Sequence, residues 1–265
     1  MLSITTDYAQ DTGDPEPYLR RIAEAGFSHI HWCHQWNTDF AYSRWEIAQI
    51  EKWLAEYSLR LLDLHGSAGK EKDWAAPQEY RRLAGVELVR NRIEMTARLA
   101  SDVVIMHVPA DPESAEVRRS LDELEPVAKA HAVRIAIENG SFAAISRLLA
   151  EYRPEYVGLC YDCGHGNIGD AAGLDHLEAL KDRLISVHLH DNDGSGDQHR
   201  LLFTATVDWP RLARVIAHSA YAKCVSMELS MRREGIDDET EFLRRAYESG
   251  TAFARMIVEA GDSAH

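Results

Sequence analysis

The sequence predicts an α/β fold, a single (β/α)8 barrel domain that spans residues 1–265. Eight short apolar runs alternate with eight stretches of helical periodicity, and no long linker interrupts them. A length of 265 residues is usual for one such domain. Six of the runs end in a side chain that can bind a metal, and a closed parallel barrel brings six such ends to one rim.

The runs are rich in Val, Ile and Leu, which is typical of strands buried on both faces of a parallel sheet. We expect strands near residues 2–6, 28–32, 59–65, 102–107, 133–138, 157–162, 184–190 and 224–228. We expect helices near residues 15–25, 43–57, 78–100, 112–131, 141–152, 174–182, 208–218 and 237–260. An open doubly wound sheet is the alternative, but it does not gather six strand ends at one point.

Local signals support individual helices. Asp208 followed by Trp209 and Pro210 predicts an N-cap with a proline in the first turn of the seventh helix. In the third helix, apolar residues at helical spacing predict a core-facing stripe of Leu83, Val86, Val89 and Ile93.

Composition excludes several classes of partner. The formal net charge of -14 disfavours nucleic acid, because phosphate backbones are bound mainly by Lys and Arg. No stretch approaches the ~20 apolar residues of a membrane span, and the first residues lack the features of a signal peptide. The four cysteines are too few for a disulfide framework, so we expect a reducing, cytoplasmic protein.

The strand-end residues carry the functional signal. The six runs end at His65, His107, Glu138, Asp162, His188 and Glu228. Glu138, Asp162, His188 and Glu228 supply three carboxylates and one imidazole, a ligand set for a divalent ion such as Mn, Co, Mg or Zn. A glutamate at the end of a buried strand is costly unless something compensates its charge. We therefore expect a metal at this rim.

Four segments show a family resemblance. The strings IENG (137–140), YDCGH (161–165), VHLHDNDGSGDQH (187–199) and MELS (227–230) resemble signature segments of the xylose-isomerase-like barrel superfamily. That superfamily includes sugar isomerases and epimerases, inosose dehydratases and apurinic endonucleases of the endonuclease IV type. The resemblance implies that Glu138, Asp162, His188 and Glu228 hold the single catalytic metal of the isomerases.

Five further residues match additional ligand positions of the trinuclear zinc site in the endonuclease branch, namely His65, His107, His165, Asp197 and His199. With Asp197, four carboxylates against three dications leave a charge of about +2, suited to a phosphodiester, whereas against one dication they leave about -2, suited to an uncharged polyol. The acidic chain favours the second case. The segment after His199, RLLFTATVDW, lacks the glycine-rich stretch common in the superfamily, which leaves the path of this loop open.

We expect a metal-dependent isomerase or epimerase of a sugar, sugar acid or cyclic polyol that acts through an enediolate, with Glu138 and Glu228 as base and acid. Candidate substrate-binding residues are His34, Trp36, His65, His107, His165 and Asp191. A dehydratase or lyase of a keto-sugar or inosose uses the same site, so it stays an alternative, as does the trinuclear apurinic endonuclease. A non-catalytic sugar-binding barrel is a weaker one. The expected partner is a small carbohydrate, and a homo-oligomer is left open.

Overall fold

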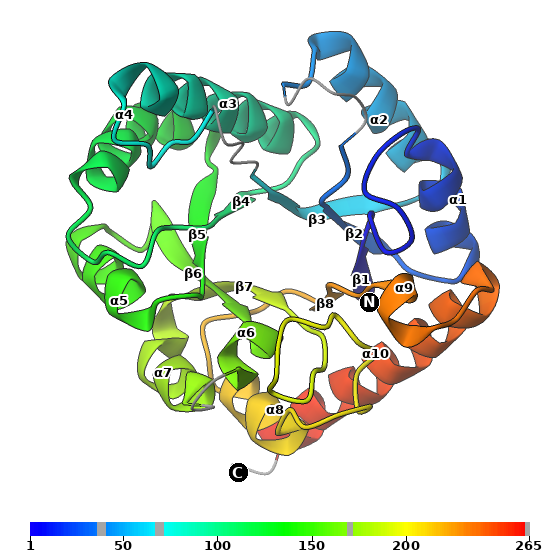
Figure 1. Ribbon diagram of the computed structural model, residues 1–265. Coiled ribbons are helices and arrows are strands. Elements are labelled where there is room, and N and C mark those ends of the chain that lie inside the picture. The colour runs from blue at the N-terminus through cyan, green and yellow to red at the C-terminus, as the bar shows by residue number, and fades with distance from the viewer. Residues whose placement is uncertain (36–40, 67–71, 169–171, 263–265) are drawn as a thin grey trace.

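The computed structural model describes residues 1–35, 41–66, 72–168 and 172–262. Its eight parallel strands form one sheet in the order β7-β6-β5-β4-β3-β2-β1-β8. The first and last strands of this order meet through a parallel bridge between Leu189 and Met227. The Leu189 N–H donates to the Ser226 carbonyl at 3.0 Å, and the Glu228 N–H donates to the Leu189 carbonyl at 3.1 Å. The sheet therefore closes into the predicted (β/α)8 barrel (Figure 1).

The strands agree with the predicted runs within two residues at each end. They are β1 (Leu2–Thr5), β2 (His29–Trp32), β3 (Arg60–His65), β4 (Val103–Met106), β5 (Arg134–Glu138), β6 (Val157–Asp162), β7 (Leu184–His188) and β8 (Val225–Met227). Glu138, Asp162 and His188 are each the last residue of their strand, and Glu228 follows directly after β8.

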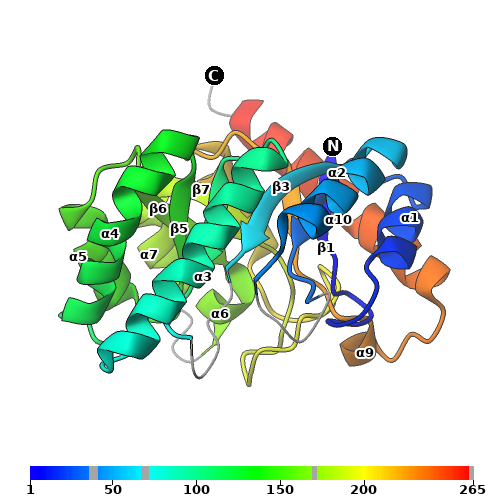
Figure 2. The ribbon, with the colours of Figure 1, turned by 90° about the horizontal axis from the view of Figure 1, so that it is seen from above.

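Among the described residues, the eight expected helices are present, together with two short additional α-helices and a 3-10 helix, η1 (Lys181–Arg183). Figure 1 shows how they surround the barrel. The expected helices are α1 (Glu16–Glu24), α2 (Arg44–Glu56), α3 (Glu79–Arg98), α4 (Ala115–His131), α5 (Phe142–Glu151), α7 (Gly173–Leu180), α8 (Trp209–Ala217) and α10 (Glu239–Asp262). The additional α-helices are α6 (Cys163–Asn167) and α9 (Met231–Glu234), which lie with the long loops at one end of the barrel (Figure 2). The Asp208 carboxylate caps α8 as predicted by accepting from the Arg211 N–H at 3.0 Å.

The prediction for the third helix is partly wrong. Val86, Val89 and Ile93 are buried, but Leu83 is 45% exposed. Arg92 is buried instead, and its guanidinium lies 4.5 Å from the ring centre of Tyr42. A long cationic side chain can be covered when its planar group stacks on an aromatic ring, and residue type alone does not show this.

The barrel interior holds a second layer of side chains beneath the strand ends. Residues two positions before the candidate ligands point to the same inner face, because side chains alternate along a strand. These residues are Asp63, Ile105, Ala136, Cys160, Ser186 and Ser226, and all are fully buried. On the side formed by β4, β5 and β6 this layer is apolar. On the side formed by β2, β3 and β7 it is polar: His31 Nδ1 lies 2.8 Å from Asp63 Oδ1, and the Ser186 hydroxyl donates to Asp63 Oδ2.

All four cysteines are free thiols. Within the described ranges, no helix combines the length and the apolar character needed to cross a membrane.

Candidate metal centre

Four side chains from consecutive strands converge at the carboxyl end of the barrel. Glu138, Asp162, His188 and Glu228 each place one donor atom within 4.8 Å of the others. His188 Nδ1 lies 2.8 Å from Glu228 Oε2 and 3.3 Å from Glu138 Oε1. Parallel strands with similar ends create this convergence, so the predicted quartet forms one cluster.

Glu138 lies at the centre of a wider cluster and is 2% exposed. Its Oε2 atom lies 3.2 Å from His65 Nε2 and 3.4 Å from His107 Nε2, while its Oε1 atom lies 3.4 Å from His165 Nδ1. The donor atoms of His65, His107 and Glu138 form a second group with mutual distances within 4.8 Å. Three of the five additional residues thus contact the Glu138 carboxylate.

A third group lies beside Asp162 and contains His190, Asp197 and His199. Asp197 Oδ2 lies 2.9 Å from His199 Nε2 and 3.6 Å from His165 Nε2. His190 Nε2 lies 3.0 Å from Asp162 Oδ1 and 3.5 Å from Asp197 Oδ1. Asp197 and His199 therefore reach the rim although the segment that follows them lacks the glycine-rich stretch. His199 adopts a φ of 47°, a left-handed conformation that is uncommon outside glycine.

Local structure fixes the orientation of Asp162. Its Oδ1 atom accepts from the His165 N–H at 2.7 Å, so the carboxylate also caps α6. The Asn139 side chain holds the same segment from β5 by donating to the Asp162 carbonyl at 2.9 Å. A Cβ atom on Gly164 would lie 1.9 Å from His190 Cε1, so only glycine lets this ring reach Asp162.

The cluster shifts the pKa values of its members in opposite directions. Burial raises the pKa of Glu138, but the imidazoles of His188, His65 and His107 outweigh burial and hold this pKa well below its usual value. Burial lowers the pKa of His188, but Cys160, Glu228 and Glu138 together raise it well above its usual value.

Nearby carboxylates also raise the pKa values of two histidines outside the quartet, His165 and His199. Burial lowers the pKa of His165, but the contact with Asp197 and the charges of Asp162 and Glu138 raise it to about 10. Burial also lowers the pKa of His199, but its contact with Asp197 and its proximity to Glu228 raise this pKa to about 9. Concentrated carboxylate charge therefore favours a cation at this rim.

The residues present fit a divalent ion. Glu138 Oε2 and both ring nitrogens of His188 are buried and make no hydrogen bond of good geometry within the described chain. Buried polar atoms are normally satisfied, and such unsatisfied atoms are costly unless a ligand engages them. Carboxylate oxygens and imidazole nitrogens are the donors that Mn²⁺, Co²⁺, Mg²⁺ and Zn²⁺ accept.

The Asp191 carboxylate accepts four hydrogen bonds from its own loop and from Trp209. One carboxylate oxygen accepts from the N–H groups of Asn192 (2.9 Å) and Val207 (3.1 Å). The other accepts from the Ala205 N–H (2.9 Å) and the Trp209 indole N–H (3.0 Å). All four strong acceptor positions are engaged, so Asp191 holds the loop that carries Asp197 and His199, and its contact with a substrate stays a prediction.

His34 and Trp36 gain no support as a substrate wall. His34 is 2% exposed, and its Nε2 atom lies 2.8 Å from the Gly13 carbonyl oxygen. Its ring packs against Tyr18 and Trp32, and none of its contacts found in the described segments joins it to the ligand cluster. Trp36 lies outside the described residues. Substrate contacts of these two residues stay a prediction.

Two buried histidines were missed from the sequence. His190 follows His188 by two residues, and the alternation of strand side chains could have placed both rings on one face. His31 lies beneath the quartet, with its ring centre 4.5 Å from that of His188. Its Nε2 atom is buried without a hydrogen bond, and Asp63 holds the opposite nitrogen. Nothing at the end of β2 marks His31, because its partner is 32 residues away.

Comparisons with known proteins agree with this architecture. A family model described as xylose isomerase-like TIM barrel matches residues 19–246. An uncharacterised protein of Sinorhizobium fredii is 28% identical over 282 residues, which cover 93% of this chain and 90% of that protein. A probable endonuclease 4 of Thermoplasma acidophilum is 25% identical over 223 residues, covering 75% and 77%. The solved structure of an L-ribulose 3-epimerase has the same fold, with a TM-score of 0.79 at 16% identity and coverage of 99% and 96%.

Proposed function

The chain belongs to the xylose isomerase-like TIM barrel family, and we propose that it is a divalent-metal-dependent isomerase or epimerase of a sugar, sugar acid or cyclic polyol. The main support is the convergence of Glu138, Asp162, His188 and Glu228, whose donor atoms lie within 4.8 Å of one another. The resemblance of the chain's fold to an L-ribulose 3-epimerase adds support for this reaction class.

The four residues of the quartet would hold the ion. When bound, a divalent ion acts as a Lewis acid that polarises a carbonyl group and so acidifies the adjacent C–H. Glu138 and Glu228 come from β5 and from the end of β8, and both contact His188. One glutamate would remove the proton from the carbon beside the carbonyl, and the other would return a proton to the resulting enediolate.

The two glutamates differ in access. Glu138 is 2% exposed beneath His65 and His107, whereas the side chain of Glu228 is 13% exposed and lines a cavity of about 210 Å³ together with His199. Glu228 is therefore better placed to exchange a proton with a substrate that enters from solvent. His165, with a side chain that is 24% exposed, would bind a substrate hydroxyl from the β6 side.

Two measurements test this proposal. Elemental analysis and anomalous scattering should find a divalent ion at the quartet, and an ion bound elsewhere would contradict the assignment. Turnover of candidate ketoses in deuterated water should place deuterium on the carbon beside the carbonyl. Product without solvent label would instead indicate a hydride shift or a different reaction. A product that has one water molecule less than the substrate would identify the dehydratase alternative, which uses the same proton abstraction.

A second candidate is a trinuclear zinc phosphodiesterase acting on abasic DNA. One observation favours it: the three ligand groups are contiguous, because Glu138 belongs to two of them and His190 joins Asp162 to the third. The net charge of -14 opposes it, because DNA affinity comes largely from Lys and Arg neutralising phosphates. We expect neither incision nor tight binding of an abasic duplex at moderate salt. Three metals per chain together with incision that is lost in Asp197→Ala would establish the nuclease.

A further inference from the structure

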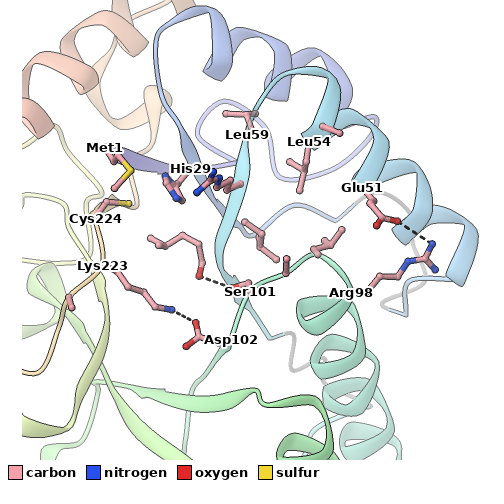
Figure 3. A pocket seen from close by; sticks show the side chains of 17 residues that line it. Met1, His29, Glu51, Leu54, Leu59, Arg98, Ser101, Asp102, Lys223 and Cys224 are labelled. Carbon is pink, nitrogen blue, oxygen red and sulfur yellow. Dashed lines mark hydrogen bonds and ion pairs between the residues drawn. The ribbon is translucent and has the colours of Figure 1, made fainter.

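The opposite end of the barrel contains a second cavity. Its volume is about 710 Å³, within the range of small-molecule sites in proteins. Residues at the beginning of strands line it, including Arg60 at the start of β3. His29 at the start of β2 and Lys223 just before β8 also line it and are labelled in Figure 3. The fully buried layer that contains His31, Asp63 and Ser186 lies between this cavity and the metal ligands. The cavity is therefore separate from the candidate metal centre.

The cavity combines an apolar wall with an excess of cations. Its apolar part comes from α2, β3 and the end of α3, through Leu54, Leu59, Leu62 and Leu99. Two carboxylates are present, and both are already paired. Figure 3 shows Glu51 beside Arg98, with Oε2 3.3 Å from Nη2, and Asp102 beside Lys223. Asp102 also contacts Arg134, which lies outside the lining.

Arg60 supplies the unbalanced charge. Its side chain is exposed and has no carboxylate partner within the residues that the structure describes. The lining holds three cations, Arg60, Arg98 and Lys223, against the two carboxylates of Glu51 and Asp102, so its side chains carry an excess of one positive charge. This excess occurs in a chain whose formal net charge is -14, so it is a local arrangement.

The positive charges near the cavity affect the pKa of His29. Burial lowers the pKa of its imidazole, and the charges of Arg60 and Lys223 lower it further. A neutral His29, whose Nδ1 atom lies 2.9 Å from the Ser28 hydroxyl, would leave Arg60 as the principal site for an anion beside the apolar wall.

We propose that this cavity is a binding site for a small organic anion, with a phosphate or carboxylate head group beside Arg60 and a short apolar body against Leu54, Leu59 and Leu62. The ligand class follows from the positive charge of Arg60 in the cavity lining, which is unpaired among the described residues, and from the leucines of the same lining. The site does not depend on the reaction at the other end of the barrel.

Calorimetric titration of the full-length chain tests the proposal, using protein without an N-terminal extension because Met1 lines the cavity. The probes are hexyl phosphate, hexanoate, inorganic phosphate and 1-hexanol. At least one of the two amphipathic anions should bind at least about tenfold more tightly than inorganic phosphate or 1-hexanol, because only these probes use both the charge and the apolar wall. The stronger of the two identifies the preferred head group.

Arg60→Gln should weaken binding of that probe by at least about tenfold, since it removes the charge-assisted contact but breaks no ion pair seen in the described chain. Arg255→Gln is the matched control, because Arg255 is an exposed arginine on α10 outside the cavity, and this variant should bind like the parent. A soaked crystal should show the head group beside Arg60. Equal binding by 1-hexanol, unchanged affinity of Arg60→Gln, or a head group located at the metal ligands would each overturn the proposal.

Discussion

The two ends of the barrel use ionisable residues in different ways. At the carboxyl end, Glu138 and Asp162 are buried, and polar atoms of the cluster lack hydrogen-bond partners. At the amino end, Asp102 has a side chain that is 43% exposed and is satisfied by Lys223 and Arg134. Buried polar atoms without hydrogen-bond partners predict a bound ion at the carboxyl end. At the amino end the carboxylates are paired and partly solvated, so their ion pairs should contribute little to stability.

The largest expected effect is on catalysis, and it compares glutamates at the two ends of the barrel. Glu138→Gln and Glu228→Gln should each lower turnover and solvent-deuterium incorporation by about 10²–10⁴-fold, because each change removes a proton-transfer group. Glu51→Gln, at the amino end, should leave both rates unchanged, since Glu51 is an exposed partner of Arg98. Steady-state kinetics and mass spectrometry measure both quantities. Full activity in either quartet variant would exclude that glutamate as a base.

The next test concerns the layer between the two ends. Asp63→Ala should lower the free energy of unfolding by about 3–5 kcal/mol, because it leaves His31 and Ser186 buried without their common partner. Asp102→Ala should cost no more than about 1 kcal/mol, because its ion pairs are half-exposed. Denaturant unfolding of both variants provides the comparison. Similar losses would show that burial does not distinguish these two carboxylates.

Metal removal should have a smaller effect that is confined to the carboxyl end. An ion present at 100 times its dissociation constant stabilises the folded state by about 2.7 kcal/mol, so chelation should lower the free energy of unfolding by about this amount. Glu138→Gln should show a much smaller response to chelation, whereas Glu51→Gln should respond like the parent. Thermal unfolding with and without chelator measures the change. A parent protein that does not respond would argue against a resident ion.

The smallest effect is a pH dependence of metal affinity. In the metal-free protein the pKa of His165 is about 10 and that of His199 is about 9, so both rings carry a proton at neutral pH. A metal that uses them must displace these protons, so affinity should rise with pH by about tenfold per unit for each displaced proton. Titration between pH 6 and 8 measures the slope. If only the quartet binds metal, His199→Gln will leave the slope unchanged; a shallower slope would place the metal at the third group.

Much of the fold could be predicted because its signals are local. Strand composition, helical periodicity and the Asp208 cap are properties of short segments, and the structure confirms the elements that they predict within a few residues. The position of Glu138, Asp162 and His188 at strand ends follows from the same local patterns. Once the strands are known to be parallel and closed, their convergence requires no further information.

Only the tertiary structure determined which side chains satisfy one another across the barrel. The Leu189–Met227 bridge closes the sheet, and the contact between His31 and Asp63 joins different strands, so neither appears in a sequence window. The four hydrogen bonds to Asp191 likewise depend on the path of its loop. The sequence by itself determined the elements and the residues available for a metal, because these follow from local spacing. The three-dimensional fold decided their partners, because burial and hydrogen bonding depend on segments that meet only in space.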